Sequence, residues 1–247
     1  MRSCSVRPFL PLVALVAAAL SAQDSGAPPA PATPPNPAIT PVARTDAGIL
    51  PRQDQVLQRA REAPPAALVF VGDSITQGWE SSGKESWERH FVPLGAVNLG
   101  VSGDRTEHVL WRLQQAPITR LAPKVIVLLI GTNNLGHGAT NAEQTLAGVL
   151  AVIALLRAQA PDARILVNEI LPRGERINAM RGDILQVNQA VRGQVDANTR
   201  CLPVGDRWVR GDGTIGKDVM PDFLHLTKAA YEQWAQALLP EIQAALK

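Results

Sequence analysis

The stretch LVFVGDSITQGW, residues 68–79, begins as an apolar run and ends in a Gly-Asp-Ser turn. A short run of valine, leucine and phenylalanine is typical of a strand that is buried on both faces of a sheet. The segment Val125–Ile130 is a second run of this kind. The strands that we predict are Ala67–Val71, Ala96–Leu99, Val125–Ile130, Ile165–Glu169 and Cys201–Val204.

Longer amphipathic segments alternate with these runs and predict helices. The predicted helices are Arg105–Gln115, Ala142–Gln159, Asp183–Asp196 and Thr227–Leu246. Asn141 is a suitable N-cap for the second of them, and Pro161 follows its end. Alternating strands and helices predict one α/β domain with a parallel sheet and helices on both faces. Ligands bind such sheets at the carboxyl ends of the strands, so we expect the functional site there.

The N-terminal region predicts export, followed by a linker. Arg2 and Arg7 precede the apolar run FLPLVALVAAAL, residues 9–20, and the small residues Ser21 and Ala22 follow it. This order is typical of a secretory signal peptide, and the run is short for a membrane span of ~20 residues. We predict a signal peptide at 1–22, a Pro/Ala-rich tether at 23–48 and a folded domain at 49–247. The protein is then secreted or periplasmic, and an uncleaved anchor is the alternative.

The composition argues against several classes of protein. The chain has 247 residues and a formal net charge of +2, with 19% charged residues. This balance favours neither a nucleic-acid partner nor a polybasic membrane anchor. Cys201 is the one cysteine beyond the leader, which predicts no disulfide and an inert thiol. The four histidines are too scattered for a zinc site, so no metal is expected.

Three predicted strands end in residues that can carry chemistry. Ser74 stands on the turn after the first strand, as either a nucleophile or a helix N-cap. Gly103 lies in the loop after the second strand, where an open backbone can point an amide at a ligand. Asn133 follows the third strand, and its side-chain amide either donates to a developing oxyanion or caps the loop.

Asp222 and His225 lie three residues apart in a turn before the last predicted helix. At this spacing the carboxylate can reach the near ring nitrogen, fix the tautomer of the histidine and stabilise its charged form. With Ser74, this pair predicts an acyl-transfer site in which serine attacks, histidine takes its proton and aspartate orients the histidine. His108 falls within a predicted helix and is expected to be a surface or packing residue. The histidines without an acid partner at this spacing are His90, His108 and His137.

The chain resembles the SGNH, or GDSL, hydrolase superfamily, and within it the platelet-activating-factor acetylhydrolase catalytic-subunit branch. The likeness runs from about Leu68 to the C-terminus, and its blocks are VGDSIT, GVSGDRTEHVLWRL, PKVIVLLIGTNN, LPRGE and DFLHLT. It implies a flavodoxin-like three-layer α/β/α sandwich with five parallel strands, and an enzyme that needs no metal or organic cofactor. Asn134 stands where many members have aspartate, a variant that the acetylhydrolase branch shares.

By position, the resemblance implies that Ser74 is the nucleophile and that Asp222 and His225 complete a catalytic triad. The backbone amides of Ser74 and Gly103 and the side-chain amide of Asn133 are then the donors of the oxyanion hole. Two further residues, Asp73 and Arg173, are candidate substrate contacts, and a surface salt bridge is the alternative for the arginine.

The resemblance implies hydrolysis of short-chain esters, chiefly acetyl esters. Polysaccharide or xylan acetyl esters and lysophospholipase-type lipid esters are alternative substrates, and acyl transfer to an alcohol uses the same residues. An inactive binding module with this fold is the alternative outside the enzyme class. Trp79, Trp87 and Trp111 are expected to pack in the core rather than to form a sugar platform. A homodimer is possible, because the subunits that the chain resembles form pairs.

Overall fold

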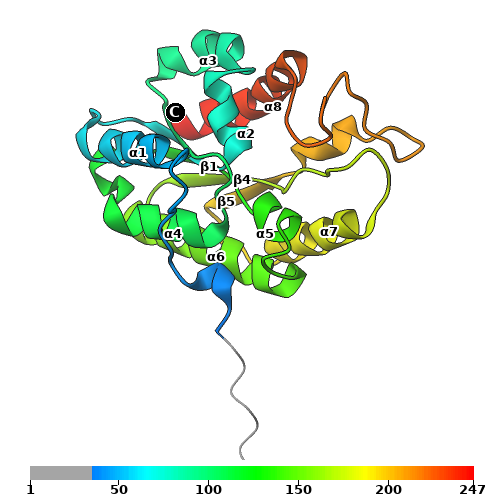
Figure 1. Cartoon of the computed structure of the whole chain (residues 1–247). Helices are drawn as coiled ribbons and strands as arrows, with labels where there is room; N and C mark the ends of the chain where they lie inside the picture. The colour runs from blue at the N-terminus through cyan, green and yellow to red at the C-terminus, as the bar shows by residue number, and fades with distance from the viewer. Residues whose placement is uncertain (1–34) are drawn as a thin grey trace, which may run out of the picture. The chain divides into compact units, whose positions relative to one another are not determined.

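Within residues 35–247, which the structure describes, five parallel strands form one sheet in the order β2-β1-β3-β4-β5. The structure is a computed structural model, and Figure 1 shows its strands between two groups of helices. The strands are β1 (Leu68–Gly72), β2 (Val97–Gly100), β3 (Val125–Leu129), β4 (Arg164–Asn168) and β5 (Thr199–Leu202). The predicted three-layer α/β fold is confirmed, and the strand bounds differ from the predicted ones by at most two residues.

The helices of this part of the chain include three of the predicted ones almost unchanged. The α-helices are α1 (Leu50–Glu62), α2 (Ser74–Gln77), α3 (Lys84–His90), α4 (Thr106–Gln115), α5 (Thr132–Gly136), α6 (Ala142–Gln159), α7 (Ala179–Arg192) and α8 (Lys228–Leu246). Short 3-10 helices are η1 (Pro37–Ile39), η2 (Gly78–Glu80), η3 (Val92–Leu94), η4 (Ile118–Leu121) and η5 (Val204–Trp208). The α7 helix begins before its predicted start because Asn178 caps it, accepting a hydrogen bond from the Arg181 amide. None of the helices between residues 35 and 247 combines the length and apolarity needed to cross a membrane.

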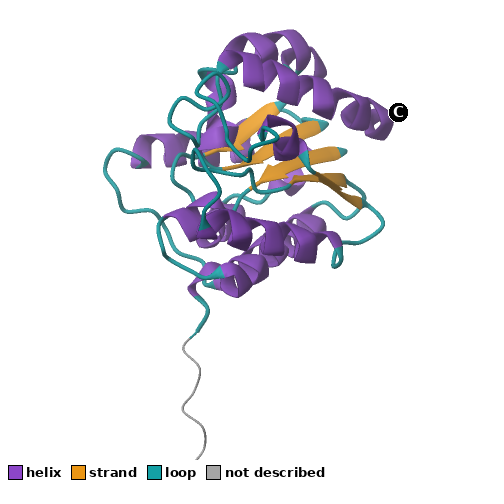
Figure 2. Ribbon diagram, turned by 90° about the vertical axis from the view of Figure 1, so that its right-hand side faces the viewer, coloured by secondary structure: helices purple, strands orange, loops and turns teal. Residues whose placement is uncertain are grey.

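Alternation along the strands divides the core into two layers. In β1, Val69 and Val71 pack in the layer that also holds α1, α4, α6 and α7. Leu68 and Phe70 point the other way, into the layer that holds α3 and α8. Successive side chains of a strand point to opposite faces, so a continuous apolar run serves both layers. Figure 2 shows the two helical layers on either side of the strands.

Aromatic side chains fill the layer under α3 and α8. Trp79 is fully buried, and its ring centroid lies 4.8 Å from that of Trp234 and 5.2 Å from that of Phe91. Trp87 belongs to the same cluster, and Trp111 packs against the opposite layer. The expectation that Trp79, Trp87 and Trp111 pack in the core, rather than on a sugar platform, is confirmed.

The compact unit of the described residues starts at Pro35, whereas the predicted folded domain starts at residue 49. Ala38 is completely buried, and its carbonyl accepts a hydrogen bond of 2.8 Å from the Thr106 hydroxyl at the start of α4. The sequence of residues 35–48 gives no sign that this segment packs on the domain. Its contacts are made by single side chains and carbonyls, and these leave no periodic pattern of apolar residues. The predicted signal peptide and residues 23–34 of the predicted tether lie outside the described residues.

The strand order places the ends of three strands beside one another. The chain moves from β1 to β2 at one side, and β3 then pairs with the other side of β1, with Gly72 opposite Leu129. The chain thus leaves β1 toward one side of the sheet and leaves β3 toward the other. In parallel sheets, a change of direction of this kind opens a crevice at the carboxyl ends of the two strands. The loops after β1, β2 and β3 therefore meet at one place.

Candidate active site

Ser74 is presented by a tight turn at the end of β1. Asp73 is the N-cap of α2, because its Oδ1 accepts a hydrogen bond of 2.9 Å from the Ile75 amide. The turn requires glycine at 72, since a Cβ there would lie 2.2 Å from Thr76 Oγ1 and 2.3 Å from the Leu129 carbonyl. The cap of this helix is thus the aspartate, and the Ser74 hydroxyl is left for another partner.

That partner is His225, which a turn before α8 places over the end of β1. The distance from Ser74 Oγ to His225 Nε2 is 2.9 Å, and His225 Nδ1 lies 2.7 Å from Asp222 Oδ2. Asp222 Oδ1 accepts hydrogen bonds from the backbone amides of Leu224 and His225. Partial burial acts to raise the pKa of Asp222, but the hydrogen bonds from the His225 ring and the two amides outweigh it and lower that pKa. The three predicted triad residues therefore form one continuous hydrogen-bonded chain.

The three residues predicted to donate to an oxyanion, Ser74, Gly103 and Asn133, follow the adjacent strands β1, β2 and β3. Within residues 35–247, neither the Ser74 amide nor the Gly103 amide donates a hydrogen bond to the protein. Gly103 has a φ of +74°, a left-handed conformation that favours glycine. Asn133 is buried, and its Nδ2 donates 2.9 Å to the Asp104 carbonyl. An amide nitrogen carries two hydrogens, so one remains for a ligand.

Comparison with known proteins identifies the family of this chain. The model of the GDSL-like lipase/acylhydrolase family matches residues 70–233. Platelet-activating factor acetylhydrolase IB subunit alpha1 of Homo sapiens is 39% identical over 173 residues, which are 69% of this chain and 73% of that protein. This chain belongs to the GDSL-like lipase/acylhydrolase family. It is a hydrolase that acts on esters, as the resemblance predicts.

A second curated relative and a solved structure are also similar to this chain. The alpha2 subunit of the same acetylhydrolase from Rattus norvegicus is 40% identical over 173 residues, with 69% of this chain and 73% of that protein covered. The solved structure of a GDSL-like lipase from Bacteroides thetaiotaomicron superposes with a TM-score of 0.67 at 21% identity, over 78% of this chain and 98% of that one. The second likeness shows that the fold is shared.

Asn134, the departure from the usual pattern of the family, is a fully buried link to α4. Its Oδ1 accepts 3.0 Å from the Thr106 amide, and its Nδ2 donates to Thr106 Oγ1 and to Glu107 Oε2. Glu107 therefore already supplies a carboxylate at this point. An amide suits position 134 because it donates a hydrogen bond to the Glu107 carboxylate. An ionised aspartate there would have no hydrogen to donate, and the two carboxylates would repel each other.

Replacement of Asn134 by aspartate is expected to lower the free energy of unfolding by ~3 kcal/mol at neutral pH, through repulsion of two buried carboxylates. The introduced carboxyl has a raised pKa in the folded state. The loss is therefore greatest at neutral pH and becomes smaller as the pH falls and the group binds a proton. Urea unfolding at several pH values measures this. The matched control is Asn141→Asp at the exposed N-cap of α6, with a change of less than about 0.5 kcal/mol expected.

The two candidate substrate contacts have different environments. Asp73 is completely buried and caps α2, an environment that does not favour contact with a substrate. Burial raises its pKa to about 7, against the hydrogen bond from the Ile75 amide. Arg173 is half-buried and donates to the Thr132 carbonyl and hydroxyl from its Nη1. Burial lowers the pKa of its guanidinium, against the charges of Asp73 and Asp222, which act to raise it. It lies near the triad and remains a candidate contact.

The other histidines of this acylhydrolase stabilise helices. His90 Nε2 lies 3.0 Å from Glu232, which joins α3 to α8 across 142 residues of sequence. Burial and then the charge of Arg105 lower the pKa of His108 to about 4, and its Nδ1 accepts from the Arg105 amide at the start of α4. His137 caps α5. Within the described residues, no group of three or more His, Cys, Asp or Glu side chains is placed to hold a metal ion.

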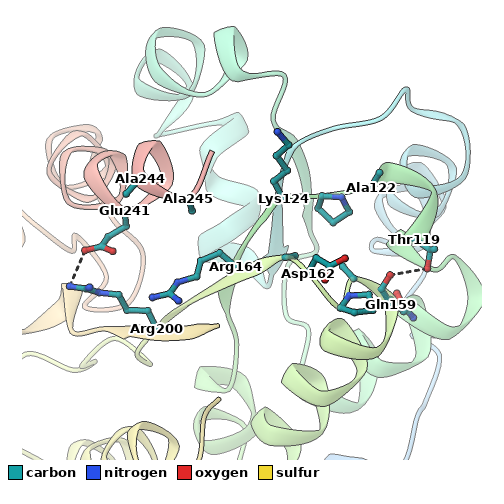
Figure 3. A pocket seen from close by; sticks show the side chains of 14 residues that line it. Thr119, Ala122, Lys124, Gln159, Asp162, Arg164, Arg200, Glu241, Ala244 and Ala245 are labelled. Carbon is teal, nitrogen blue, oxygen red and sulfur yellow. Dashed lines mark hydrogen bonds and ion pairs between the residues drawn. The ribbon is translucent and has the colours of Figure 1, made fainter. Parts of the chain in front are cut away.

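A cavity of about 800 Å³ lies at the opposite end of the sheet (Figure 3). Lys124, Arg164 and Arg200 line it, and Arg200 pairs with Glu241 at 3.0 Å. These residues lie at the starts of strands, whereas Ser74, Gly103 and Asn133 follow the ends of strands. No predicted site residue lines this cavity, so size alone does not identify the functional site in this fold.

Proposed function

We propose that this acylhydrolase is a serine esterase in which Ser74 is the nucleophile, His225 the general base and Asp222 the group that orients the histidine. The observation that carries the proposal is the pair of contacts at 2.9 Å and 2.7 Å that joins the three side chains. A serine hydroxyl is a weak nucleophile until an adjacent base accepts its proton, and an acid behind the base fixes the tautomer that can do so.

The reaction then has two steps. Ser74 Oγ attacks the ester carbonyl carbon while its proton moves to His225 Nε2, and the carbonyl oxygen becomes an oxyanion. The C–O bond of the ester breaks, and the alcohol leaves with the proton from His225. Water attacks the acyl-enzyme and gives a proton to the same nitrogen. The carboxylic acid is released, and Ser74 regains its hydrogen.

Replacement of Asn133 by alanine is expected to lower kcat by ~100-fold with little change in KM, because one donor to the oxyanion is lost. Steady-state kinetics with an acetyl ester measures it. Asn198→Ala, in the exposed turn before β5, is the matched control. A loss of less than about fivefold at Asn133 would contradict its role in the oxyanion hole.

We propose acetyl esters as the preferred substrates, in line with the 39% identity to an acetylhydrolase subunit. The side chains of His225 and Asp222 are 45% and 56% exposed, which suits an ester carried on a bulky alcohol. This exposure favours a polysaccharide acetyl ester as the second candidate. We propose that the half-buried Arg173 contacts a polar group of either alcohol. Release of acetate from acetylated xylan, compared with release from an acetylated glycerol ether lipid, distinguishes the two.

The order of residues 1–22 supports a further proposal, that the enzyme is exported to the periplasm or the exterior. The mass of the protein recovered from a bacterial expression host tests it. Loss of about 22 residues from an exported product supports cleavage. Recovery of the complete chain from the cytoplasm alone contradicts it.

Labelling with a fluorophosphonate tests the proposed nucleophile directly. The probe is expected to modify Ser74 in the wild-type protein, seen by mass spectrometry of its peptides, and to leave His225→Ala unmodified, because the hydroxyl is then not activated. Folded wild-type protein that takes up no probe would contradict the esterase proposal and would favour a binding module.

A further inference from the structure

Residues 36–48 form a segment that crosses the first turns of two helices. Figure 1 shows this segment, in dark blue, beside α4 and α6 before the chain enters α1. Asn36 Nδ2 donates 3.3 Å to the Gln144 carbonyl at the start of α6, and the Val42 amide donates 3.2 Å to the Glu107 carbonyl of α4. With the bond from Thr106 to Ala38, these contacts fix the segment beside the loop that connects β2 to α4.

The segment contains Arg44, whose side chain is only 12% exposed and lies against that loop. Its Nη1 donates 3.1 Å to the Ser102 carbonyl and 3.3 Å to Asp104 Oδ1, and its Nε donates 2.8 Å to Asp46. A Cβ built on Gly103 would lie 3.1 Å from Nη1 and 3.3 Å from Nη2. The guanidinium therefore covers one side of Gly103 and binds the residue on each side of it.

The same loop is bound from two other directions. The fully buried Asp104 carboxylate accepts 2.8 Å from Arg112 Nε, and Arg112 Nη2 approaches the Gly72 carbonyl at 3.4 Å. The Asp104 carbonyl accepts the hydrogen bond from Asn133. The two proposed oxyanion donors other than Ser74 are thus joined through Asp104, which Arg112 of α4 and Arg44 of residues 36–48 both bind.

We propose that Arg44 is a positioning residue that holds the Gly103 amide, and through Asp104 the Asn133 amide, in the direction of the oxyanion. The inference rests on the proposed serine esterase function. A glycine with a φ of +74° has neighbouring conformations of similar energy, so its amide direction depends on outside contacts. Donors stabilise an oxyanion only when they are aimed in advance at the place where charge develops.

The test compares Arg44→Ala with wild type in the full chain, with kcat expressed per serine that a fluorophosphonate titrates. We expect kcat to fall about tenfold and KM to stay within about twofold, because the contact matters in the transition state rather than in substrate binding. Arg44→Lys is expected to recover part of the loss, since an ammonium keeps the charge but cannot reproduce the planar set of donors. Arg61→Ala, which removes an arginine bound to the Gln115 carbonyl at the far end of α4, is the matched control.

A double variant separates positioning from general stability. If Arg44 acts through the oxyanion hole, Arg44→Ala combined with Asn133→Ala loses less than the product of the two separate losses. An unchanged kcat in Arg44→Ala, an equal loss in Arg61→Ala, or fully multiplicative losses would overturn the inference while leaving the esterase intact. Wild-type protein without a reactive serine would overturn the proposed function, and the role of Arg44 with it.

Discussion

Replacement of Ser74 by alanine is expected to lower kcat for an acetyl ester by ~10⁶-fold, the largest effect of any single change in this chain. The side chain supplies the one atom that forms the acyl-enzyme, so the two-step route is lost as a whole. What remains is the contribution of binding and of the oxyanion donors, which still exceeds the reaction in water. The hydroxyl contacts His225 at the edge of solvent, so the free energy of unfolding should change by less than about 0.5 kcal/mol.

Three measurements make this prediction specific. The rate of acetate release gives kcat, thermal unfolding gives the stability, and the mass of the protein after reaction with a fluorophosphonate shows whether a serine is modified. Ser81→Ala is the matched control, because the hydroxyl of this exposed serine donates only to the Gly78 carbonyl in the preceding turn. Activity of Ser74→Ala within a hundredfold of wild type would place the nucleophile elsewhere and would contradict the proposed mechanism.

The fold and the triad turn could be predicted because their signals are local. Strands such as Val125–Leu129 are continuous apolar runs that are buried on both faces of the sheet. Such runs are typical of the strands of a parallel sheet covered by helices on both sides. Asp222 and His225 lie three residues apart, so one turn determines whether they meet. The pairing of His225 with Ser74 across 151 residues followed from the rule that parallel strands collect their sites at one end.

The supporting contacts could not be predicted, because tertiary packing alone brings them together. Arg44 and Ser102 are 58 residues apart, and the arginine comes from a segment whose composition is that of a linker. Asp73 shows the opposite case, in which a residue next to a site is given too large a role. Its place beside Ser74 in the sequence suggests contact with substrate, whereas the turn buries its side chain as a helix cap. Position in a motif indicates proximity to a site, but which side of the turn a side chain occupies depends on the packing around it.

Replacement of Asp222 by asparagine is expected to lower kcat by ~10⁴-fold, because it changes which ring nitrogen of His225 carries the proton. Asp222 uses Oδ1 to accept two backbone amides and Oδ2 to accept His225 Nδ1. An asparagine has one oxygen, and the two amide donors retain it. Its NH2 group then faces Nδ1, which must become an acceptor, so the ring proton moves to Nε2. A protonated Nε2 cannot take the proton of Ser74, and the base is lost although the geometry is kept.

Steady-state kinetics between pH 5 and pH 9 measures this loss. Asp218→Asn is the matched control, because this carboxylate lies in the same loop and pairs with Arg210 instead of a histidine. In the wild type, the lowered pKa of Asp222 keeps it ionised over the whole range, so no change in rate above about pH 5 should come from its protonation. A variant Asp222→Asn that retained a tenth or more of wild-type kcat would show that solvent at this exposed edge can orient His225 unaided, and the triad would reduce to a serine and a histidine.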